Sequence, residues 1–311
     1  MKILVTGAAG FIGSHLAEGL LEAGHEVVGV DNFNGYYERA LKERNAASVR
    51  AAGGLVLELD LVEDDLSGAL EGVAVAFHAA AQPGLSPHTS DGDYERNNCV
   101  ATQRLIAACS DSGEFEMLFY LSTSSIYGPV ATSDERAEPA PTSTYGRTKL
   151  AAERSVLAAS VAGKLRACAL RIFSVYGPRE RPEKLFPLLI DSLHREEPFP
   201  LFEGSMAHER SFTYVGDIVE GMLAALQRRG TLDGEVINLG SEHTETTATG
   251  IRLIEELVGA KAEFSMEPPR PGDQLKTAAQ IGKARRLLAY APTTKLRDGL
   301  AREVEWFSVQ D

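Results

Sequence analysis

A tyrosine and a lysine stand four positions apart, at Tyr145 and Lys149, in a segment whose pattern predicts a helix. This spacing places both side chains one turn apart on the same helix face. A phenol with its ordinary pKa of about 10 is a poor base at neutral pH, but a neighbouring ammonium stabilises the phenolate and lowers that pKa. The pair therefore predicts a general base that takes a proton from a hydroxyl group. The alternative is that Tyr145 is an exposed helix residue without a catalytic role.

Four hydroxyl-bearing residues follow the apolar run Met117–Leu121, which predicts a buried strand, and precede the Tyr145 helix in the sequence. Side chains at the carboxyl end of such a strand reach the crevice in which open parallel sheets bind ligands. We therefore expect a hydroxyl group of this run to lie beside the atom on which Tyr145 acts. The four residues are Ser122, Thr123, Ser124 and Ser125.

A glycine-rich turn lies between the first apolar run and the first predicted helix. Gly7 permits a tight turn, Gly10 lets the backbone approach a pyrophosphate, and Gly13 lets the helix pack closely on the strand. The N–H groups of the turn and the helix dipole then attract the anion. Asp31, about 20 residues further on, is placed to bind both hydroxyls of a ribose and to repel a 2′-phosphate, which favours NAD over NADP. The alternative is a purely structural turn.

The segments that position these residues alternate between short apolar runs and helical patterns, an order that predicts βαβ units. Near-continuous apolar strands are expected where helices cover both faces of a sheet. The predicted fold class is therefore α/β, with a doubly wound parallel sheet. Strands are expected at Lys2–Val5, Glu26–Asp31, Leu55–Leu59, Val73–Phe77, Met117–Leu121 and Leu165–Ile172. Helices are expected at Phe11–Ala23, Arg39–Ala51, Asp93–Ser110 and Thr144–Val161.

The pattern changes after Ile172, where prolines punctuate short segments, as expected for a cap made of loops and small elements. The helical run Asp217–Gln227 and the apolar run Glu235–Leu239 then indicate a return to the sheet. We therefore predict a nucleotide-binding domain of residues 1–172, with a return at about 215–240, and a smaller α/β cap of residues 173–214 and 241–311. Further helices are expected at Thr249–Val258, Ile281–Leu288 and Leu296–Val309.

The composition is that of an average globular protein, since 44% of the 311 residues are hydrophobic and 24% are charged. The net charge of −13 argues against a general nucleic-acid binder, because such binders need a basic surface. No apolar run approaches the roughly 18 residues of a membrane span, and the first residues form a strand pattern rather than a signal peptide. The three cysteines lack metal-ligand spacing and are odd in number. They predict reduced thiols, no bound metal and a cytoplasmic location.

Several further motifs stand in one order along almost the whole chain. Together with the two motifs above they resemble the extended short-chain dehydrogenase/reductase superfamily. The resemblance is to its NAD-dependent sugar-nucleotide epimerase/dehydratase branch, which implies a Rossmann domain with a substrate cap. The motifs are TGAAGFIGS (Thr6–Ser14), FHAAA (Phe77–Ala81), STSSIYG (Ser122–Gly128), YGRTK (Tyr145–Lys149), RIFSVYGP (Arg171–Pro178), ERSFTYV (Glu209–Val215) and RPGD (Arg270–Asp273).

Within that branch the chain most resembles the UDP-glucuronate 4-epimerases. The segment Asp31–Tyr37, DNFNGYY, together with Leu41 and Lys42 is similar to one typical of them, and Ser174 stands where many UDP-glucose epimerases have Asn. The dehydratases and decarboxylases of this branch carry acidic residues in the region held here by Ser124–Ser125, which argues against both reactions. Two departures from the family pattern are Ser86, where relatives have Arg, and Ser211, where they have Asp.

The resemblance implies epimerisation at C4 of a UDP-hexose, with UDP-glucuronate as the expected substrate, through a transient 4-keto intermediate. It implies that Tyr145 removes the proton of the C4 hydroxyl and that Thr123 hydrogen-bonds the C4 oxygen. Lys149 would lower the pKa of Tyr145 and hold the nicotinamide ribose. The alternatives are a 4-epimerase of UDP-glucose or UDP-N-acetylglucosamine and, in another class, a NAD-binding sensor or scaffold. Retention of all three residues weighs against the sensor, because binding alone needs no general base.

The same resemblance assigns residues to the two ligands and to a homodimer, in which the helices Asp93–Ser110 and Thr144–Val161 pair across a two-fold axis. NAD is expected to contact Gly7, Gly10, Phe11, Ile12, Gly13, Asp31, Asn32, Asp60, Leu61, Ala79, Ala80, Ala81, Asn98, Tyr145 and Lys149. The UDP-sugar is expected to contact Ser124, Ser125, Ser174, Arg181, Arg210, Arg270 and Asp273. Arg210 and Arg270 match positions that hold the pyrophosphate. Asp60 has the simpler alternative of a strand-end cap, and Asn98 that of a helix-terminal polar residue.

Overall fold

A seven-stranded, fully parallel sheet forms the centre of the protein in this computed structural model, which describes residues 1–84, 89–270 and 272–308. Its strands lie in the order β12-β7-β5-β4-β1-β2-β3. The chain runs outward from β1 in one direction and from β4 in the other, and the crevice at such a reversal is where ligands bind. The predicted doubly wound α/β fold is confirmed. The strands are β1 (Lys2–Thr6), β2 (Glu26–Asp31), β3 (Leu55–Glu58), β4 (Val73–His78), β5 (Met117–Thr123), β7 (Ala167–Ile172) and β12 (Val236–Leu239).

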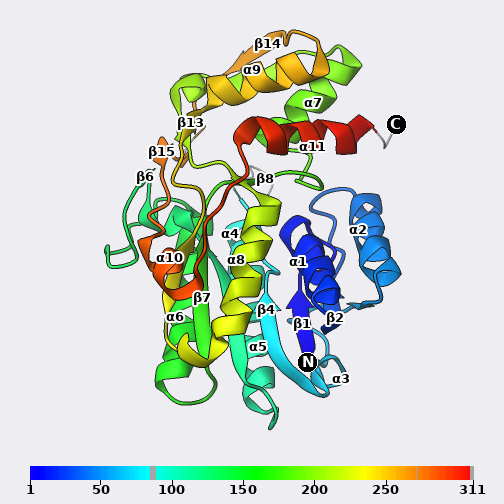
Figure 1. The fold of residues 1–311 in the computed structure, drawn as a ribbon, viewed down its shortest axis with the longest axis vertical. Helices are drawn as coiled ribbons and strands as arrows, with labels where there is room; N and C mark the ends of the chain where they lie inside the picture. Colours follow the sequence, from blue (N-terminus) through cyan, green and yellow to red (C-terminus); the bar gives the residue numbers. More distant parts are fainter. Residues whose placement is uncertain (85–88, 271, 309–311) are drawn as a thin grey trace.

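Helices cover both faces of this sheet (Figure 1). Helices α1, α2, α8 and α10 pack on one face, and α3, α5 and α6 pack on the other. All seven residues of β5 and all six of β7 are buried, as expected for strands covered on both sides. The helices are α1 (Phe11–Glu22), α2 (Arg39–Ala51), α3 (Ser67–Leu70), α5 (Ala101–Ser110), α6 (Thr144–Val161), α8 (Val215–Arg228) and α10 (Gly282–Leu288).

One predicted helix of this domain is divided in the structure. The pattern predicts one helix at Asp93–Ser110, whereas the chain forms α4 (Asp91–Tyr94), a π-helical segment (Glu95–Val100) and α5. The start lies two residues earlier because Ser90 and Asp93 cap each other's backbone N–H groups. The π-helical segment contains Asn98, so its altered spacing sets the direction of that side chain.

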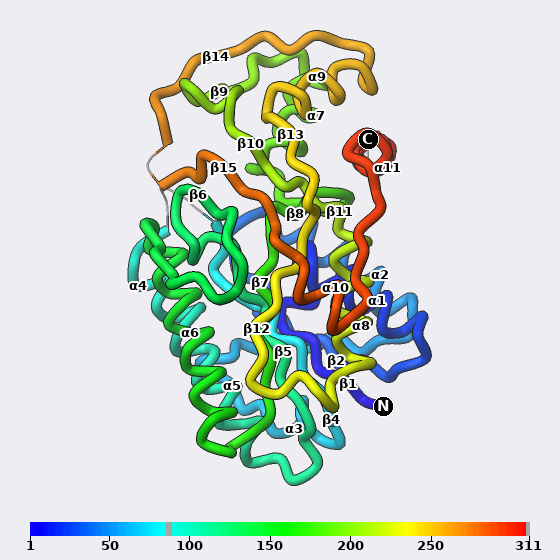
Figure 2. Tube along the Cα trace, turned by 60° about the vertical axis from the view of Figure 1, so that its left-hand side comes forward, coloured from blue at the N-terminus to red at the C-terminus, as the bar shows by residue number. Residues whose placement is uncertain are grey.

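A second layer of helices lies beyond the carboxyl ends of the strands (Figure 2). It has its own apolar core, in which Phe186, Leu189, Ile254 and Leu300 are buried. The helix α7 was not predicted, because prolines punctuate the sequence after Ile172. Pro187 lies in the first turn of α7, where a missing N–H is tolerated. The helices are α7 (Leu185–Arg195), α9 (Thr247–Val258) and α11 (Leu296–Ser308). The remaining short strands are β6 (Val130–Ala131), β8 (Val175–Tyr176), β9 (Phe199–Phe202), β10 (Glu209–Arg210), β11 (Thr213–Tyr214), β13 (Glu245–Thr246), β14 (Phe264–Glu267) and β15 (Lys276–Thr277).

The chain returns to the sheet in its second half, where α8 packs on α1 and β12 pairs with β7. The helix α10, within the segment predicted as cap, also packs on α8 and β12. The predicted domain limits themselves stay a prediction. The last helix was expected to end at Val309, which lies outside the described residues, and α11 is described as far as Ser308.

Two expectations from the composition concern thiols and membranes. Cys99, Cys109 and Cys168 are all free and buried, which confirms the prediction of reduced thiols. Within the described part of the chain, no helix combines the length and the apolar character needed to cross a membrane.

Candidate functional site

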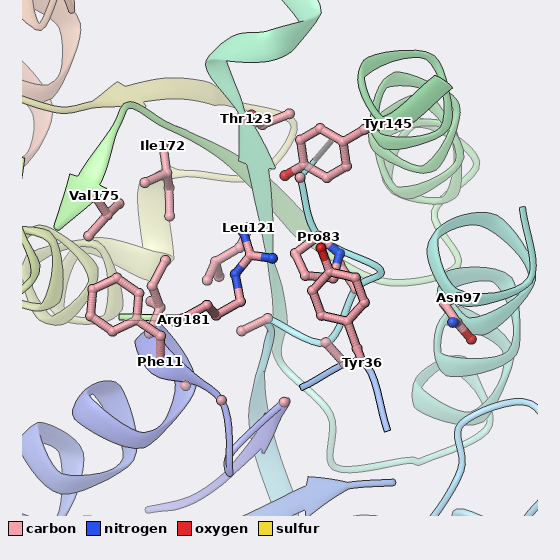
Figure 3. A pocket seen from close by; sticks show the side chains of 18 of the residues that line it. Phe11, Tyr36, Pro83, Asn97, Leu121, Thr123, Tyr145, Ile172, Val175 and Arg181 are labelled. Atoms are coloured by element: carbon pink, nitrogen blue, oxygen red, sulfur yellow. The ribbon is translucent and has the colours of Figure 1, made fainter. Parts of the chain in front are cut away.

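A cavity of about 430 Å³ opens at the carboxyl ends of the central strands, below the cap (Figure 3). It is lined by the glycine-rich turn, by the ends of β2, β4, β5 and β7, and by loops of the cap. Most of the predicted site residues face it. From the predicted cofactor, catalytic and substrate sets, the lining includes Gly7, Gly10, Phe11, Ile12, Gly13, Asp31, Asn32, Asp60, Leu61, Ala79, Ala80, Ala81, Thr123, Ser124, Ser125, Tyr145, Ser174, Arg181, Arg210, Arg270 and Asp273.

The glycine-rich turn forms one wall of the cavity. Gly7 has a φ of +72°, a conformation that favours glycine, and a Cβ built on Gly13 would overlap the Gly7 carbonyl oxygen. The helix α1 therefore approaches β1 as closely as the spacing predicts. Gly10, the residue before α1, offers no side-chain cap to the first helical turn. The N–H groups of that turn are left for an anion in the cavity.

Acidic residues mark the ends of β2 and β3. Both carboxylate oxygens of Asp31 accept backbone hydrogen bonds, from Ala9 at 3.1 Å and from Phe33 at 2.9 Å. Burial raises the pKa of Asp31, and the charge of Lys42 opposes this. Asp60 accepts hydrogen bonds from Asn32 at 2.9 Å, from the Arg96 guanidinium and from the backbone N–H of Val62. Asp60 thus lines the cavity and also caps the backbone after β3. The structure is therefore compatible with both a cofactor contact and a strand-end cap at this position.

Tyr145 and Thr123 lie beside each other in the wall of the cavity (Figure 3). Tyr145 lies in the first turn of α6. Ser143 caps the start of this helix, because its hydroxyl accepts a hydrogen bond from the Gly146 N–H. Burial raises the pKa of Tyr145, whereas its hydrogen bond with Thr123 and the charge of Arg181 lower it.

Lys149 lies behind this wall rather than in it. Its side chain is 2% exposed, and its ammonium donates a hydrogen bond of 2.6 Å to the Leu121 carbonyl oxygen. The ammonium also stacks on the Tyr120 ring, 4.2 Å from its centroid, and burial lowers the pKa of Lys149 to about 7. Thr123 and Arg181 lower the pKa of Tyr145, and the Lys149 ammonium is directed at a backbone carbonyl. The expected effect of Lys149 on the pKa of Tyr145 stays a prediction.

Three serine hydroxyls approach the cavity from two loops. Ser124 and Ser125 stand in a 3₁₀ turn after β5, and the Thr123 hydroxyl accepts a hydrogen bond of 3.1 Å from the Ser125 N–H. Ser174 follows β7, and its hydroxyl lies 3.4 Å from that of Thr277. Short neutral donors are thus gathered near Tyr145.

Three arginines line the part of the cavity next to the cap. Arg210 lies 3.3 Å from Asp273, which also lies 3.5 Å from the His208 ring, so Asp273 is held by two groups of the cap. Arg270 stacks on the Phe202 ring at 4.1 Å. Arg181 reaches the cavity between Leu121 and Tyr36 (Figure 3).

The loop that carries Arg181 is tied to helix α1. The His15 ring donates a hydrogen bond of 2.8 Å to the Pro178 carbonyl oxygen, and Arg179 forms an ion pair of 2.9 Å with Glu18. Burial lowers the pKa of His15 to about 4, so the ring is neutral at neutral pH. Arg181 itself pairs with Glu183 at 2.6 Å. The substrate side of the cavity is therefore anchored on α1.

Asn98 lies outside the cavity wall although it was assigned to the cofactor. It is 1% exposed, accepts a hydrogen bond of 2.7 Å from the Gln82 N–H and donates one of 3.0 Å to Thr148. It thereby joins the loop after β4 to α6. His78 is fully buried between the hydroxyls of Thr6 and Thr102, as expected of a hydrogen-bonded core residue.

The two departures from the family pattern have different outcomes. Ser211 is fully buried, and its hydroxyl donates a hydrogen bond of 2.7 Å to the Ser241 carbonyl oxygen, so it contributes to packing of the cap. Ser86 lies outside the described residues.

Several lining residues were not identified from the sequence. Tyr36 and Tyr37 stood in the segment quoted for the resemblance, which was the available signal. Lys42 was quoted with that segment but was not assigned to either ligand. The residues missed include Asn34, Tyr36, Tyr37, Lys42, Pro83, Gly84, Asn97, Glu180, Glu183, Lys184 and Gln274.

The model of the NAD dependent epimerase/dehydratase family matches residues 3–240. This chain belongs to that family. It is 38% identical to an uncharacterized UDP-glucose epimerase, YtcB, of Bacillus subtilis, and the match covers 99% of this chain and 98% of that protein. It is 32% identical to UDP-glucuronate 4-epimerase 2 of Arabidopsis thaliana, over 99% of this chain and 76% of that one.

A solved structure of a family member has the same fold. The UDP-glucuronic acid 4-epimerase of Bacillus cereus, in complex with UDP-glucuronic acid and NAD, superposes with a TM-score of 0.95. The two proteins are 36% identical, and the match covers 100% of both chains. The family and the fold expected from the motifs are thus confirmed.

Proposed function

We propose that this protein is a NAD-dependent isomerase that inverts C4 of a UDP-hexose, with UDP-glucuronate as its substrate and UDP-galacturonate as its product. The observation that carries the proposal is one cavity whose lining brings together Tyr145 and Thr123, a glycine-rich turn and three arginines. A general base alone serves many reactions, but this combination of groups fits a cofactor, a sugar and a diphosphate in one cavity.

The residues present fit NAD. The tight turn at Gly7, the close contact at Gly13 and the uncapped first turn of α1 form a pyrophosphate cradle. Asp31, which lines the cavity, would hold one of its ribose groups. When bound, NAD supplies a carrier that takes up the C4 hydride and returns it to the opposite face.

The reacting oxygen is controlled by two hydroxyl groups of the chain. The Tyr145 phenolic oxygen takes the proton of the C4 hydroxyl and later returns a proton to the C4 oxygen. Thr123, already hydrogen-bonded to Tyr145, holds the same oxygen. Because burial raises the pKa of Tyr145, the Thr123 hydrogen bond and the positive charge of Arg181 are needed to make this proton transfer possible at neutral pH.

A glucuronate carboxylate fits the serine hydroxyls near Tyr145. Ser124, Ser125 and Ser174 are short donors on two loops, and such donors bind a carboxylate without a tight ion pair. A tight ion pair would hinder rotation of the 4-keto intermediate between its two faces. The arginines Arg210 and Arg270 are suited to the diphosphate, because a guanidinium binds phosphate oxygens in pairs.

A second candidate is a 4-epimerase of UDP-glucose. The observation that favours it is the 38% identity with the Bacillus subtilis protein described as a UDP-glucose epimerase. The serine hydroxyls also accept and donate hydrogen bonds with a hydroxymethyl group, so the sugar must be decided by assay.

We also propose a cytoplasmic homodimer. Helices α5 and α6 lie side by side on one face of the sheet (Figure 2) and carry the segments expected to pair. Val100, directly before α5, and Val161, the last residue of α6, are exposed apolar residues. The three free thiols fit a reducing compartment. Light scattering at micromolar concentration tests the dimer, and a mass of one 33.5 kDa chain would contradict it.

A panel of UDP-sugars tests the proposed reaction. The purified protein is incubated with UDP-glucuronate, UDP-glucose and UDP-N-acetylglucosamine, and the products are separated by chromatography. We expect UDP-galacturonate from UDP-glucuronate, and a smaller yield of the C4 epimer from the other two sugars. Equal conversion of UDP-glucose would replace the proposal with the second candidate.

A further inference from the structure

A buried cation lies beside Asp31 in the cofactor half of the cavity. Lys42, on α2, is 5% exposed and lines the same cavity as Asp31 and Asn34. Lys42 forms no ion pair with a carboxylate that the structure describes, and its charge acts on Asp31 from beyond ion-pair distance. A lysine that is both buried and unpaired is uncommon, because burial of a charge costs free energy unless a partner compensates for it.

The partners of the Lys42 ammonium are neutral. It donates hydrogen bonds to the carbonyl oxygen of Asn34 at 2.8 Å and to the side-chain oxygen of Asn34 at 2.7 Å. It also lies over the Tyr37 ring, 4.8 Å from its centroid. An ammonium has three N–H donors, and no third hydrogen bond joins Lys42 to the described residues. One N–H donor of the ammonium is therefore left for a ligand.

The neighbouring cation of the same helix is in a different situation. Arg39 is exposed and pairs with Glu43 at 2.7 Å and with Glu58 at 2.6 Å. Its charge is compensated by two carboxylates, and it does not belong to the described cavity lining. Arg39 is therefore a matched control, since it is a cation on the same helix but not directed at a ligand.

We infer that Lys42 forms a latent phosphate subsite at the adenosine ribose, so that Asp31 alone excludes NADP. The inference rests on the proposed function, because it takes the ribose of NAD to lie at Asp31. In doubly wound folds the acid at this place binds the 2′-hydroxyl and repels a 2′-phosphate, whereas a nearby cation accommodates that phosphate. This chain holds both groups in one cavity. Lys42 screens the charge of Asp31 and keeps a donor that a phosphate oxygen is able to accept.

The consequence is a simple route to a change of cofactor. Substitution of Asp31 by Asn removes the repulsion and leaves Lys42 in place. A charge-assisted hydrogen bond to phosphate then favours NADP by about 10- to 100-fold over the same variant without Lys42. In the natural chain, Lys42 also limits how strongly NADP is rejected.

The test is a calorimetric titration of the purified full chain with NAD and, separately, with NADP. The readout is the ratio of the two dissociation constants, because damage to the loop at Asn34 weakens both cofactors and cancels in the ratio. The variants are Asp31→Asn, Asp31→Asn with Lys42→Met, Asp31→Asn with Lys42→Arg, and Asp31→Asn with Arg39→Gln.

We expect Asp31→Asn to shift the ratio towards NADP and Lys42→Met to remove at least about 10-fold of that shift. Lys42→Arg and Arg39→Gln should keep the shift. An unchanged ratio after Lys42→Met, or an equal loss after Arg39→Gln, would overturn the inference. Failure of the wild-type chain to bind either nucleotide would instead overturn the proposed cofactor site, and the inference with it.

Discussion

The Glu303 carboxyl group is fully buried in the core of the cap, on α11. Neither of its oxygens has a hydrogen-bond partner of ordinary geometry among the described residues. Burial and the charge of Glu180 raise the pKa of Glu303 well above its ordinary value of 4.5, and the nearby Gly177 N–H opposes this only in part. We predict that replacing Glu303 with leucine stabilises the protein, because a buried polar group without a partner costs about 1–3 kcal/mol.

The gain from Glu303→Leu should depend on pH in a defined direction. In the unfolded chain the carboxyl group loses its proton above pH 4.5, whereas in the folded chain it keeps the proton to a higher pH. Stability of the wild type therefore falls as the pH rises from the unfolded to the folded pKa, by about 1.4 kcal/mol per pH unit. Leucine has no proton to exchange, so the difference between variant and wild type grows with the same slope.

Urea unfolding at about pH 5 and about pH 7 measures both effects. Glu305→Leu, an exposed position on the same helix, is the control and should show neither the gain nor the slope. A variant Glu303→Leu that is less stable than the wild type at both pH values would show that the carboxyl group has a stabilising partner. A gain that does not change with pH would show that Glu303 titrates normally in the folded protein.

Three further predictions concern the site and its support. Tyr145→Phe should lower kcat by at least about 10²-fold while NAD still binds, and an unchanged rate would exclude Tyr145 as the base. Ser174→Asn should remove much of the preference for UDP-glucuronate over UDP-glucose in kcat/KM, and equal preference in variant and wild type would exclude a role for Ser174. Glu153→Gln breaks a buried pair with Arg171, joined at 2.6 Å, and should cost about 3–5 kcal/mol of unfolding free energy. A loss below about 1 kcal/mol would show that the buried pair contributes no more to the unfolding free energy than an exposed surface pair does.

The elements with a single strong pattern could be predicted from the sequence. The strand Glu26–Asp31 and the helices Arg39–Ala51 and Thr144–Val161 have the predicted bounds. In these segments the apolar period and the end signals agree, so local preference and tertiary packing favour the same structure. The glycine-rich turn belongs to this group, since Gly7 and Gly13 are required by the local backbone.

Other features depend on contacts between distant segments and could not be predicted. The direction of Lys149 depends on the Leu121 carbonyl, and that of Arg181 on the anchoring of its loop to α1. Lys42 was missed because a lysine in an amphipathic helix is usually solvated, and only the packed structure shows that it is buried. The helix α7 was missed because a proline was read as a break, although the first turn of a helix tolerates it.

The fate of the hydrogen at C4 tests the proposed reaction most directly. UDP-glucuronate labelled with deuterium at C4 is converted in ordinary water, and the product is analysed by mass spectrometry and NMR. Removal and return of the same C4 hydride within one cavity predicts UDP-galacturonate that keeps the deuterium at C4. Loss of the label to solvent, or a product with unchanged configuration at C4, would contradict the proposed function.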